Sequence, residues 1–174
     1  MPQHKVTGLK QTSSTVAIGF SATETAANTF KQTVVDLNLD PLNNEVFVVL
    51  AIDLNPTAPN SVAGQNTQVA ASLTSTSQTS VQNLSNSNCL ADSVLDIRQD
   101  AGALTGPSFA RIAQESPATM LDYIGIIATN DFFVQVQGTN NTAVRGVSGK
   151  MYGYRARADA SIYAALVQSE VLSA

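Results

Sequence analysis

The sequence predicts an all-β fold, a single jelly-roll sandwich or barrel of about eight antiparallel strands. The first observation is that short apolar or alternating segments recur at intervals of roughly 8 to 15 residues and are separated by Gly, Pro and Asn. The second is that no internal repeat of fixed period is visible, which argues against solenoids and propellers. The third is the length, because 174 residues suit one domain with a substantial core.

The first predicted strands are Val16–Phe20 and Thr29–Leu39. Residues 35–40 alternate strictly between apolar and polar side chains, which is the period of a half-buried strand. Pro41 ends this strand, and the two asparagines that follow it favour a turn.

The next strand, Glu45–Asp53, is apolar on both faces. A strand of this kind must be covered on both sides, either in the middle of a sandwich or at a contact between subunits. Its apolar run, Val46–Ile52, is far shorter than the ~20 residues needed to span a bilayer.

No charged residue occurs between Asp53 and Asp92, and sixteen of the twenty-two residues in 67–88 are Ser, Thr, Asn or Gln. Composition alone suggests a disordered linker. However, Val69, Ala71 and Leu73 alternate with polar neighbours, which favours one or two strands and a neutral loop. Neutral amides and hydroxyls can be buried against a neighbouring subunit if they are hydrogen-bonded. We therefore expect subunit contacts in the uncharged span 54–91.

Further strands are predicted at Ala91–Ile97, Met120–Ala128, Asp131–Gln137 and Val147–Arg157, while Ser108–Gln114 fits a short helix or a strand. The second region where we expect subunit contacts is 131–157. The candidate contact residues in the two regions are Val69, Leu73, Phe133, Tyr152, Tyr154, Arg155 and Arg157.

The tail from Asp159 to Leu172 changes its period. Asp159 is suited to cap a helix, and a broad apolar stripe follows it. We expect a short C-terminal amphipathic helix, with a last strand as the alternative.

The chain lacks the residues that common catalytic and metal sites require. His4 is the only histidine and Cys89 the only cysteine, so no intrachain disulfide and no thiolate zinc cage can form. A catalytic triad or a histidine metal site would depend entirely on His4. We expect no enzymatic activity, no metal and no cofactor, although a site made only of carboxylates stays open because the chain has thirteen acidic residues.

Charge restricts the partners. Charged residues make up only 13% of the chain, against about 25% in an ordinary soluble protein. Because interface cores are depleted in Lys, Glu and Asp, this deficit suggests that much of the protein's surface is buried against neighbouring subunits. A secreted β domain with a neutral polar surface has a similar composition and is the alternative. The net charge of −4 argues against specific nucleic acid binding.

The N-terminus, residues 1–12, is predicted to be an arm that precedes one jelly-roll domain at 13–174. It lacks the apolar core of a signal peptide, so we expect the chain either to be synthesised as an intracellular protein or to be a mature form without its leader. Deletion of residues 1–12 is expected to impair assembly without unfolding the barrel.

Asp131–Val136 and Met151–Arg157, together with the length and the neutral Ser/Thr/Asn-rich loops, resemble small single jelly-roll capsid proteins. The type is the vertical single β-barrel major capsid protein of icosahedral, internal-membrane DNA viruses. The resemblance covers the architecture rather than a motif, and no site residue transfers through it. It implies upright barrels, pseudo-hexameric capsomers, often a second capsid protein, and a membrane vesicle beneath the shell.

The expected function is therefore that of a capsid subunit that self-assembles into an icosahedral shell and is located in the virion. Its expected partners are copies of itself, a second capsid protein, and an internal membrane reached through the N-terminal arm. Two alternatives stay open. One is a subunit of an extracellular filament or surface lattice, and the other is a monomeric glycan-binding jelly-roll module.

Overall fold

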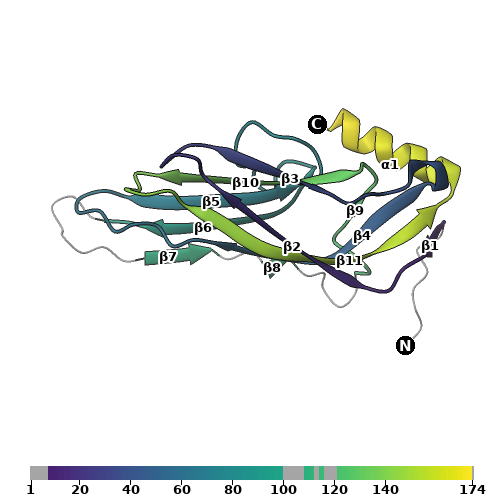
Figure 1. Cartoon of the computed structure of the whole chain (residues 1–174), viewed down its shortest axis with the longest axis horizontal. Coiled ribbons are helices and arrows are strands. Elements are labelled where there is room, and N and C mark those ends of the chain that lie inside the picture. Colours follow the sequence, from purple (N-terminus) through teal and green to yellow (C-terminus); the bar gives the residue numbers. More distant parts are fainter. Residues whose placement is uncertain (1–7, 100–107, 112–113, 116–120, 174) are drawn as a thin grey trace.

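The computed structural model describes residues 8–99, 108–111, 114–115 and 121–173. Two antiparallel sheets pack face to face, and a helix lies at one end of them (Figure 1). The elements are β1 (Leu9–Gln11), β2 (Val16–Thr23), β3 (Lys31–Asp36), the 3-10 helix η1 (Pro41–Asn43), β4 (Glu45–Pro56), β5 (Thr67–Thr74), β6 (Cys89–Ile97), β7 (Ser108–Arg111), β8 (Gln114–Glu115), β9 (Gly125–Ile127), β10 (Asp131–Thr139), β11 (Gly146–Ala158) and α1 (Ala160–Leu172).

The order of the strands is that of a jelly roll. Sheet A runs β2-β11-β4-β9, with β1 also pairing with β11 and β8 with β4, and sheet B runs β3-β10-β5-β6-β7. Four strands of each sheet make up the jelly roll, and in chain order they are β2, β3, β4, β5, β6, β9, β10 and β11. Along this series, the chain crosses from one sheet to the other at every step except between β5 and β6. This interleaving of the early and late halves of the chain distinguishes a jelly roll from a simple meander. The predicted fold class is confirmed.

The main core fills the space between the sheets. β4 contributes Phe47 and Leu54 from sheet A, and β10 contributes Phe132 and Val134 from sheet B, all four side chains being 0% exposed. The ring of Phe132 meets that of Phe20 edge to face, with centroids 5.8 Å apart and planes at 79°. Edge-to-face contact is a preferred geometry for aromatic pairs, so it links β2 of sheet A firmly to β10.

Strand β4 is buried on both faces, as its sequence predicts. Phe47 and Val49 point into the main core, whereas Val46 and Val48 point outward and are also 0% exposed. A shift of register opposite Gly153 of β11 makes β4 carry one extra residue there. A side chain at Gly153 would collide with the backbone of Val48, so glycine allows the two strands to approach at this irregularity.

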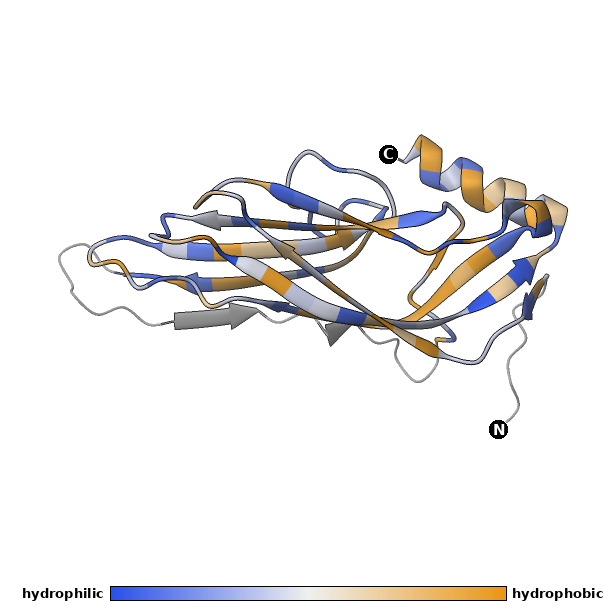
Figure 2. Cartoon of the chain, in the orientation of Figure 1, coloured by the Kyte–Doolittle hydropathy of each residue, from blue (hydrophilic) through white to orange (hydrophobic). Residues whose placement is uncertain are grey.

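The cover on the outer face of β4 is α1 of the same chain. Ile162, Tyr163, Leu166 and Val167 pack in one cluster with the outward valines of β4. Apolar residues of α1 and of β4 lie at the same end of the molecule (Figure 2). Neither of the two covers that the sequence suggested, a sandwich middle or a second subunit, is needed for this face.

Asp159 caps the start of helix α1, as predicted. The carboxylate accepts hydrogen bonds from the backbone N–H of Ile162 at 2.9 Å and from the hydroxyl of Ser161 at 2.8 Å. These bonds to the charged form lower the pKa of Asp159 from its usual 3.8. The helix alternative for the tail is therefore the one that the structure contains.

Some predicted bounds differ in the structure. β3 ends at Asp36, yet Leu37 and Leu39 are still buried, and both donate backbone hydrogen bonds to Asn130, at 2.8 and 2.7 Å. Asn38 between them adopts a left-handed conformation (φ 53°). The ambiguous segment 108–114 contributes β7 and the start of β8, so it is not helical where it is described. In the predicted arm, residues 9–11 form β1, and residues 1–7 lie outside the described residues, as does Met120.

Candidate assembly surfaces

Two of the predicted contact residues, Val69 and Leu73, lie in the main core. Both side chains are 0% exposed and pack between the sheets. β5, which carries them, is an inner strand flanked by β10 and β6. Neither residue has surface left to offer a neighbouring subunit, so both contribute to the stability of the single chain.

Phe133 lies on the outer face of sheet B. It is half-buried on β10, opposite Val34 of β3 on one side and Thr74 of β5 on the other. Val34 is 55% exposed. Cross-strand pairs of this kind stabilise a sheet, and this one also presents apolar surface to the outside. Phe133 remains a candidate contact.

Tyr152 and Tyr154 share the outer face of sheet A but differ in their cover. Tyr152 is 37% exposed, whereas Tyr154 is half-buried in the cluster beneath α1. Burial raises the pKa of the Tyr154 hydroxyl above its usual 10.0, and the neighbouring Asp122 and Tyr123 raise it further. Tyr152 is thus free to meet a partner, while Tyr154 serves the packing of the helix.

Arg155 is engaged within its own chain. One guanidinium nitrogen lies 2.7 Å from the carboxylate of Glu45 and also donates to the carbonyl of Asn38 at 3.1 Å. The other donates to the carbonyl of Leu37 at 2.6 Å. Arg157 is exposed and donates to the side-chain oxygen of Asn43 at 2.6 Å. Arg155 therefore fixes the turn after β3, and Arg157 keeps exposed surface for a contact.

A network of neutral side chains is buried on the outer face of sheet B. The hydroxyl of Ser72 donates to Gln135 Oε1 at 2.6 Å. In turn, Gln135 Nε2 donates to Thr74 Oγ1 at 2.7 Å and to Gln32 Oε1 at 3.0 Å. Ser72, Thr74 and Gln135 are 0% exposed. Burial of amides and hydroxyls at this depth is tolerable because each one is hydrogen-bonded.

The segment that covers this network is 75–88, which arches over the outer side of sheet B after β5 (Figure 1). The backbone N–H of Gln82 donates to Ser72 Oγ at 3.0 Å, and that of Gln78 donates to Gln32 Oε1 at 2.8 Å. Some neutral side chains of the uncharged span, such as Ser72, Thr74 and Asn88, are thus buried within the chain itself, whereas others, such as Ser77, Thr79 and Ser85, are exposed. The use of the uncharged span 54–91 as a subunit contact stays a prediction.

A second cover is fixed by Glu170, a buried carboxylate near the end of α1 that is 7% exposed. It accepts hydrogen bonds from the backbone N–H groups of Ala128 at 2.8 Å and Thr129 at 3.0 Å, and from the Thr129 hydroxyl at 2.7 Å. The carbonyl of Glu170 also accepts from Asn88 Nδ2 at 3.1 Å. One residue therefore joins the helix to the turn between β9 and β10 and to the segment that covers sheet B.

At the opposite end of the sandwich, Glu24 joins two connections. Its carboxylate, 4% exposed, accepts from the backbone N–H of Asn28 at 3.2 Å and of Arg145 at 3.0 Å, and also from that of Gly138. The link thus runs from the β2–β3 connection to β10 and the β10–β11 connection.

Three asparagines extend this link to the loop between β4 and β5. Asn28 and Asn141 bond reciprocally, the side-chain amide of Asn28 donating to the Asn141 carbonyl at 2.9 Å and the Asn141 N–H donating back at 2.8 Å. The Asn60 N–H donates to Asn141 Oδ1 at 2.8 Å, and Asn60 Oδ1 accepts from the backbone of Thr142 and Ala143. The loops at this end of the sandwich are therefore joined to one another by hydrogen bonds, mainly from asparagine side chains.

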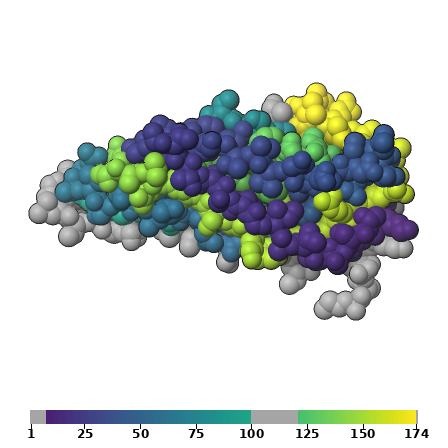
Figure 3. Space-filling model, in the orientation of Figure 1, coloured from purple at the N-terminus to yellow at the C-terminus, as the bar shows by residue number. Residues whose placement is uncertain are grey.

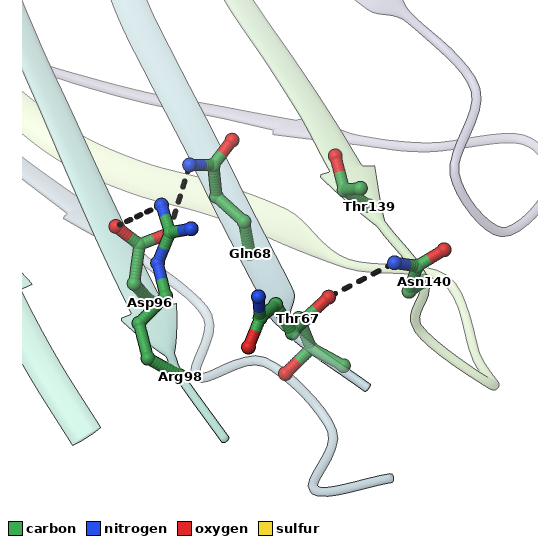
Figure 4. Close-up of a pocket in the computed structure, with 7 residues that line it drawn as sticks. Thr67, Gln68, Asp96, Arg98, Thr139 and Asn140 are labelled. Carbon is green, nitrogen blue, oxygen red and sulfur yellow. Dashed lines mark hydrogen bonds and ion pairs between the residues drawn. The ribbon is translucent and has the colours of Figure 1, made fainter. Parts of the chain in front are cut away.

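A shallow hollow of roughly 160 Å³ lies beside these loops, at the ends of β5, β6 and β10 (Figure 4). In it, Asp96 accepts from Gln68 Nε2 at 2.8 Å and lies 3.6 Å from the guanidinium of Arg98. Asn140 Nδ2 donates to the Asn66 carbonyl at 2.9 Å. Because these polar groups are paired with one another, the hollow is not preorganised for a ligand. Its lining residues are Asn66, Thr67, Gln68, Asp96, Arg98, Thr139 and Asn140.

Comparisons with known proteins add little to this geometry. No family model matches the chain, and no curated protein matches it. Twelve chains of solved structures match, among them one described as Desmodium yellow mottle tymovirus, with 11% identity, a TM-score of 0.30 and a probability of 0.98. That alignment covers 85% of this chain and 91% of the other. An overlap at this TM-score carries no functional argument, and the jelly-roll assignment rests on the strand order.

Two observations concern the part of the chain that the structure describes. Its residues include no group of three or more His, Cys, Asp or Glu side chains placed to hold a metal ion. Within the same residues, no helix reaches the length and apolarity needed to cross a bilayer.

The sequence reasoning missed the residues that fix the covers and the loop end, above all Glu24, Asn60, Asn141 and Glu170. A partial signal exists for the loops, because asparagine is the non-glycine residue best suited to left-handed backbone. Asn28 (φ 63°) and Asn140 (φ 58°) adopt it. For Glu170, an acid within an apolar stripe is the signal, since a buried acid in a helix needs a partner.

Proposed function

We propose that this chain is a viral capsid subunit and that copies of it self-assemble into a closed icosahedral shell in the virion. The jelly-roll strand order supports this proposal, although lectin domains and cupins use the same architecture. Because a fold hosts many functions, the surface has to supply the argument.

The observation that carries the proposal is the part of the outer side of sheet A that α1 leaves uncovered. We call it the open face. None of its residues belongs to the cluster beneath the helix. Its exposed members are Ala17, Gly19, Ser21, Asn55, Ser148, Lys150 and Tyr152.

The open face is neutral and formed mainly by small side chains. Lys150 is the one charged residue among the exposed members named above, and it stands directly opposite the half-buried Asp53 of β4 in the register, so the local charge is balanced. Small neutral groups lose little when water is removed, whereas unpaired Lys and Glu lose a great deal. A standard contact buries about 800 Å² per partner, and interface cores are poor in charge. In its low charge, the open face is suited to the core of such a contact.

In its finer form, the proposal follows the resemblance noted above. The shell would be of the type found in internal-membrane DNA viruses, with a second capsid protein and a membrane reached through residues 1–12. Because β1 belongs to sheet A and Leu9 packs in the cluster beneath α1, deletion of residues 1–12 would also remove part of that packing. Deletion of residues 1–7 tests the arm without that cost.

The experiment is size-exclusion chromatography with light scattering, followed by negative-stain electron microscopy of the purified full chain. Closed shells support the proposal. Helical or planar assemblies would instead support the filament or surface-lattice alternative. An 18.2 kDa monomer that persists at high concentration would contradict every assembly reading, and glycan-array binding by that monomer would identify the third alternative.

A further inference from the structure

Among the described residues, strand β2 is an edge of sheet A and pairs only with β11. It pairs with β11 from Val16, opposite Gly153, to Thr23, opposite Gly146. Neighbouring residues of an antiparallel strand direct their backbone groups to opposite sides. The hydrogen bond from the Glu24 N–H to the Arg145 carbonyl, 3.0 Å, fixes the phase of this alternation.

It follows that the even-numbered residues of β2 bond to β11, while Ala17, Gly19, Ser21 and Thr23 direct their N–H and C=O groups away from it. No hydrogen bond among the described residues uses these outward groups. β2 crosses the visible face of the molecule without any described segment over it (Figure 3).

This edge also lacks the features that usually prevent edge strands from pairing. Natural edges carry charges, proline or bulges that block the approach of another strand. No charged residue and no proline occurs between Lys10 and Glu24, and the pairing of β2 with β11 shows no shift of register. By contrast β3, the edge of sheet B, has Lys31 at its start and Asp36 at its end.

We propose that the outer edge of β2 pairs with the same edge of a second copy, antiparallel and about a twofold axis, so that two A sheets become one continuous sheet. An antiparallel edge is complementary to itself under a twofold rotation. Any charge near that axis would face its own copy, and like charges directly opposite one another are destabilising. A strand without charges therefore fits its own copy better than it fits a charged partner.

The side chains next to the edge leave room for this approach. Ala17, Gly19 and Ser21 are small and exposed on the open face, and a side chain built at Gly19 would meet no atom within 4 Å. The pairing rests on the proposed assembly function and names the contact through which assembly would begin.

A cysteine scan tests the pairing and gives its register. Ala17→Cys, Gly19→Cys and Ser21→Cys are oxidised singly, and also as the mixtures 17 with 19 and 19 with 21. In an antiparallel pair, residues directly opposite have Cα atoms about 5.5 Å apart, which is within disulfide range. One single variant or one mixture should give a disulfide-linked dimer in high yield. Val34→Cys on exposed β3 is the control that should stay uncrosslinked.

A blocking variant tests whether the edge matters for assembly. Gly19→Lys places two ammonium groups near the axis and should weaken association at least about tenfold. Asn55→Lys puts the same charge on the open face two strands away from the edge, and it should weaken the edge-paired dimer itself much less. Circular dichroism of both variants checks that the fold is retained.

The outcomes separate this inference from the proposed function. If the wild type forms closed shells, Gly19→Lys forms them equally well and no cysteine variant crosslinks, the edge pairing is wrong and the capsid proposal stands. If one cysteine position crosslinks and Gly19→Lys dissociates the dimer, but no closed shell appears, the edge pairing stands and the capsid proposal fails. A wild type that remains monomeric and does not crosslink at any position overturns both.

Discussion

The outer faces of the two sheets are covered by the same chain in two different ways. On sheet B the cover is polar, with segment 75–88 bonded to a buried network centred on Gln135. On sheet A the cover is apolar, with α1 packed on Val46 and Val48, and it protects only one end of the sheet. The remainder of sheet A is the open face.

Two different sequence patterns, one polar and one apolar, thus both occur where a sheet is covered by the chain itself. The long uncharged span and the strand that is apolar on both faces each predicted a covered surface, and neighbouring subunits were considered as the cover for both. The outer face of β4 and the polar network on sheet B are both covered from within the chain, although side chains of the covering segment such as Ser77 and Thr79 are exposed. The open face and the edge of β2 stay accessible to a partner, as do Phe133 on sheet B and Arg157.

The largest effect is expected where the apolar cover is broken. Val48→Asp places a charge between β4 and α1, at a site that is 0% exposed. A buried unpaired carboxylate should lower the free energy of unfolding by about 3 kcal/mol or more. Val34→Asp is the matched control on an exposed strand position, expected within about 1 kcal/mol of wild type. Equal losses in urea denaturation would show that α1 does not seal this face.

A smaller loss is expected where the two covers are joined. Glu170→Ala leaves the backbone N–H groups of Ala128 and Thr129 without their acceptor. Unsatisfied buried donors should cost about 1–3 kcal/mol of unfolding free energy. Gln168→Ala, an exposed position on the same helix, should change the stability by no more than about 0.5 kcal/mol. Hydrogen exchange should also rise in α1, and unchanged exchange there would contradict the role assigned to Glu170.

A loss of similar or smaller size is expected from the polar cover. Gln135→Ala removes the amide that bonds to Ser72, Thr74 and Gln32, and the free energy of unfolding should fall by about 1–2 kcal/mol. Because the network anchors segment 75–88, exchange of its backbone amides should increase selectively. Gln137→Ala, half-buried on the same face of β10, is the comparison variant and should leave that segment protected.

The smallest effect is expected from pH at the start of α1. Hydrogen bonds to its charged form lower the pKa of Asp159 in the folded chain below the usual 3.8. The stabilisation is therefore present above about pH 3.8 and is lost as the pH falls through the lowered value. Asp159→Asn keeps a capping side chain but cannot titrate. Thermal unfolding followed between pH 5 and 2 should show a smaller decline for the variant, and identical profiles would argue against the assignment.

Much of the fold could be predicted because strands of a sandwich display their inner face directly in the sequence. The alternation of Val69, Ala71 and Leu73 with polar neighbours predicted the buried side of β5, and Asp159 predicted the cap of the helix. Little of the candidate surface could be predicted in this way. Val69 and Leu73 alternate with polar neighbours, and this pattern shows that one face of the strand is apolar. It does not show whether that face packs against the second sheet of the same chain or against another subunit.

The sequence by itself determined that this chain is β-rich, that it has few charges to expose, and that its two unusual segments would be covered. Only the tertiary structure decided what covers them and which edge stays open. The physical reason is that burial depends on neighbours brought together from distant parts of the chain, as when Glu170 meets Ala128 or Gln82 meets Ser72. Local patterns report that a surface will be hidden, and the topology decides what lies against it.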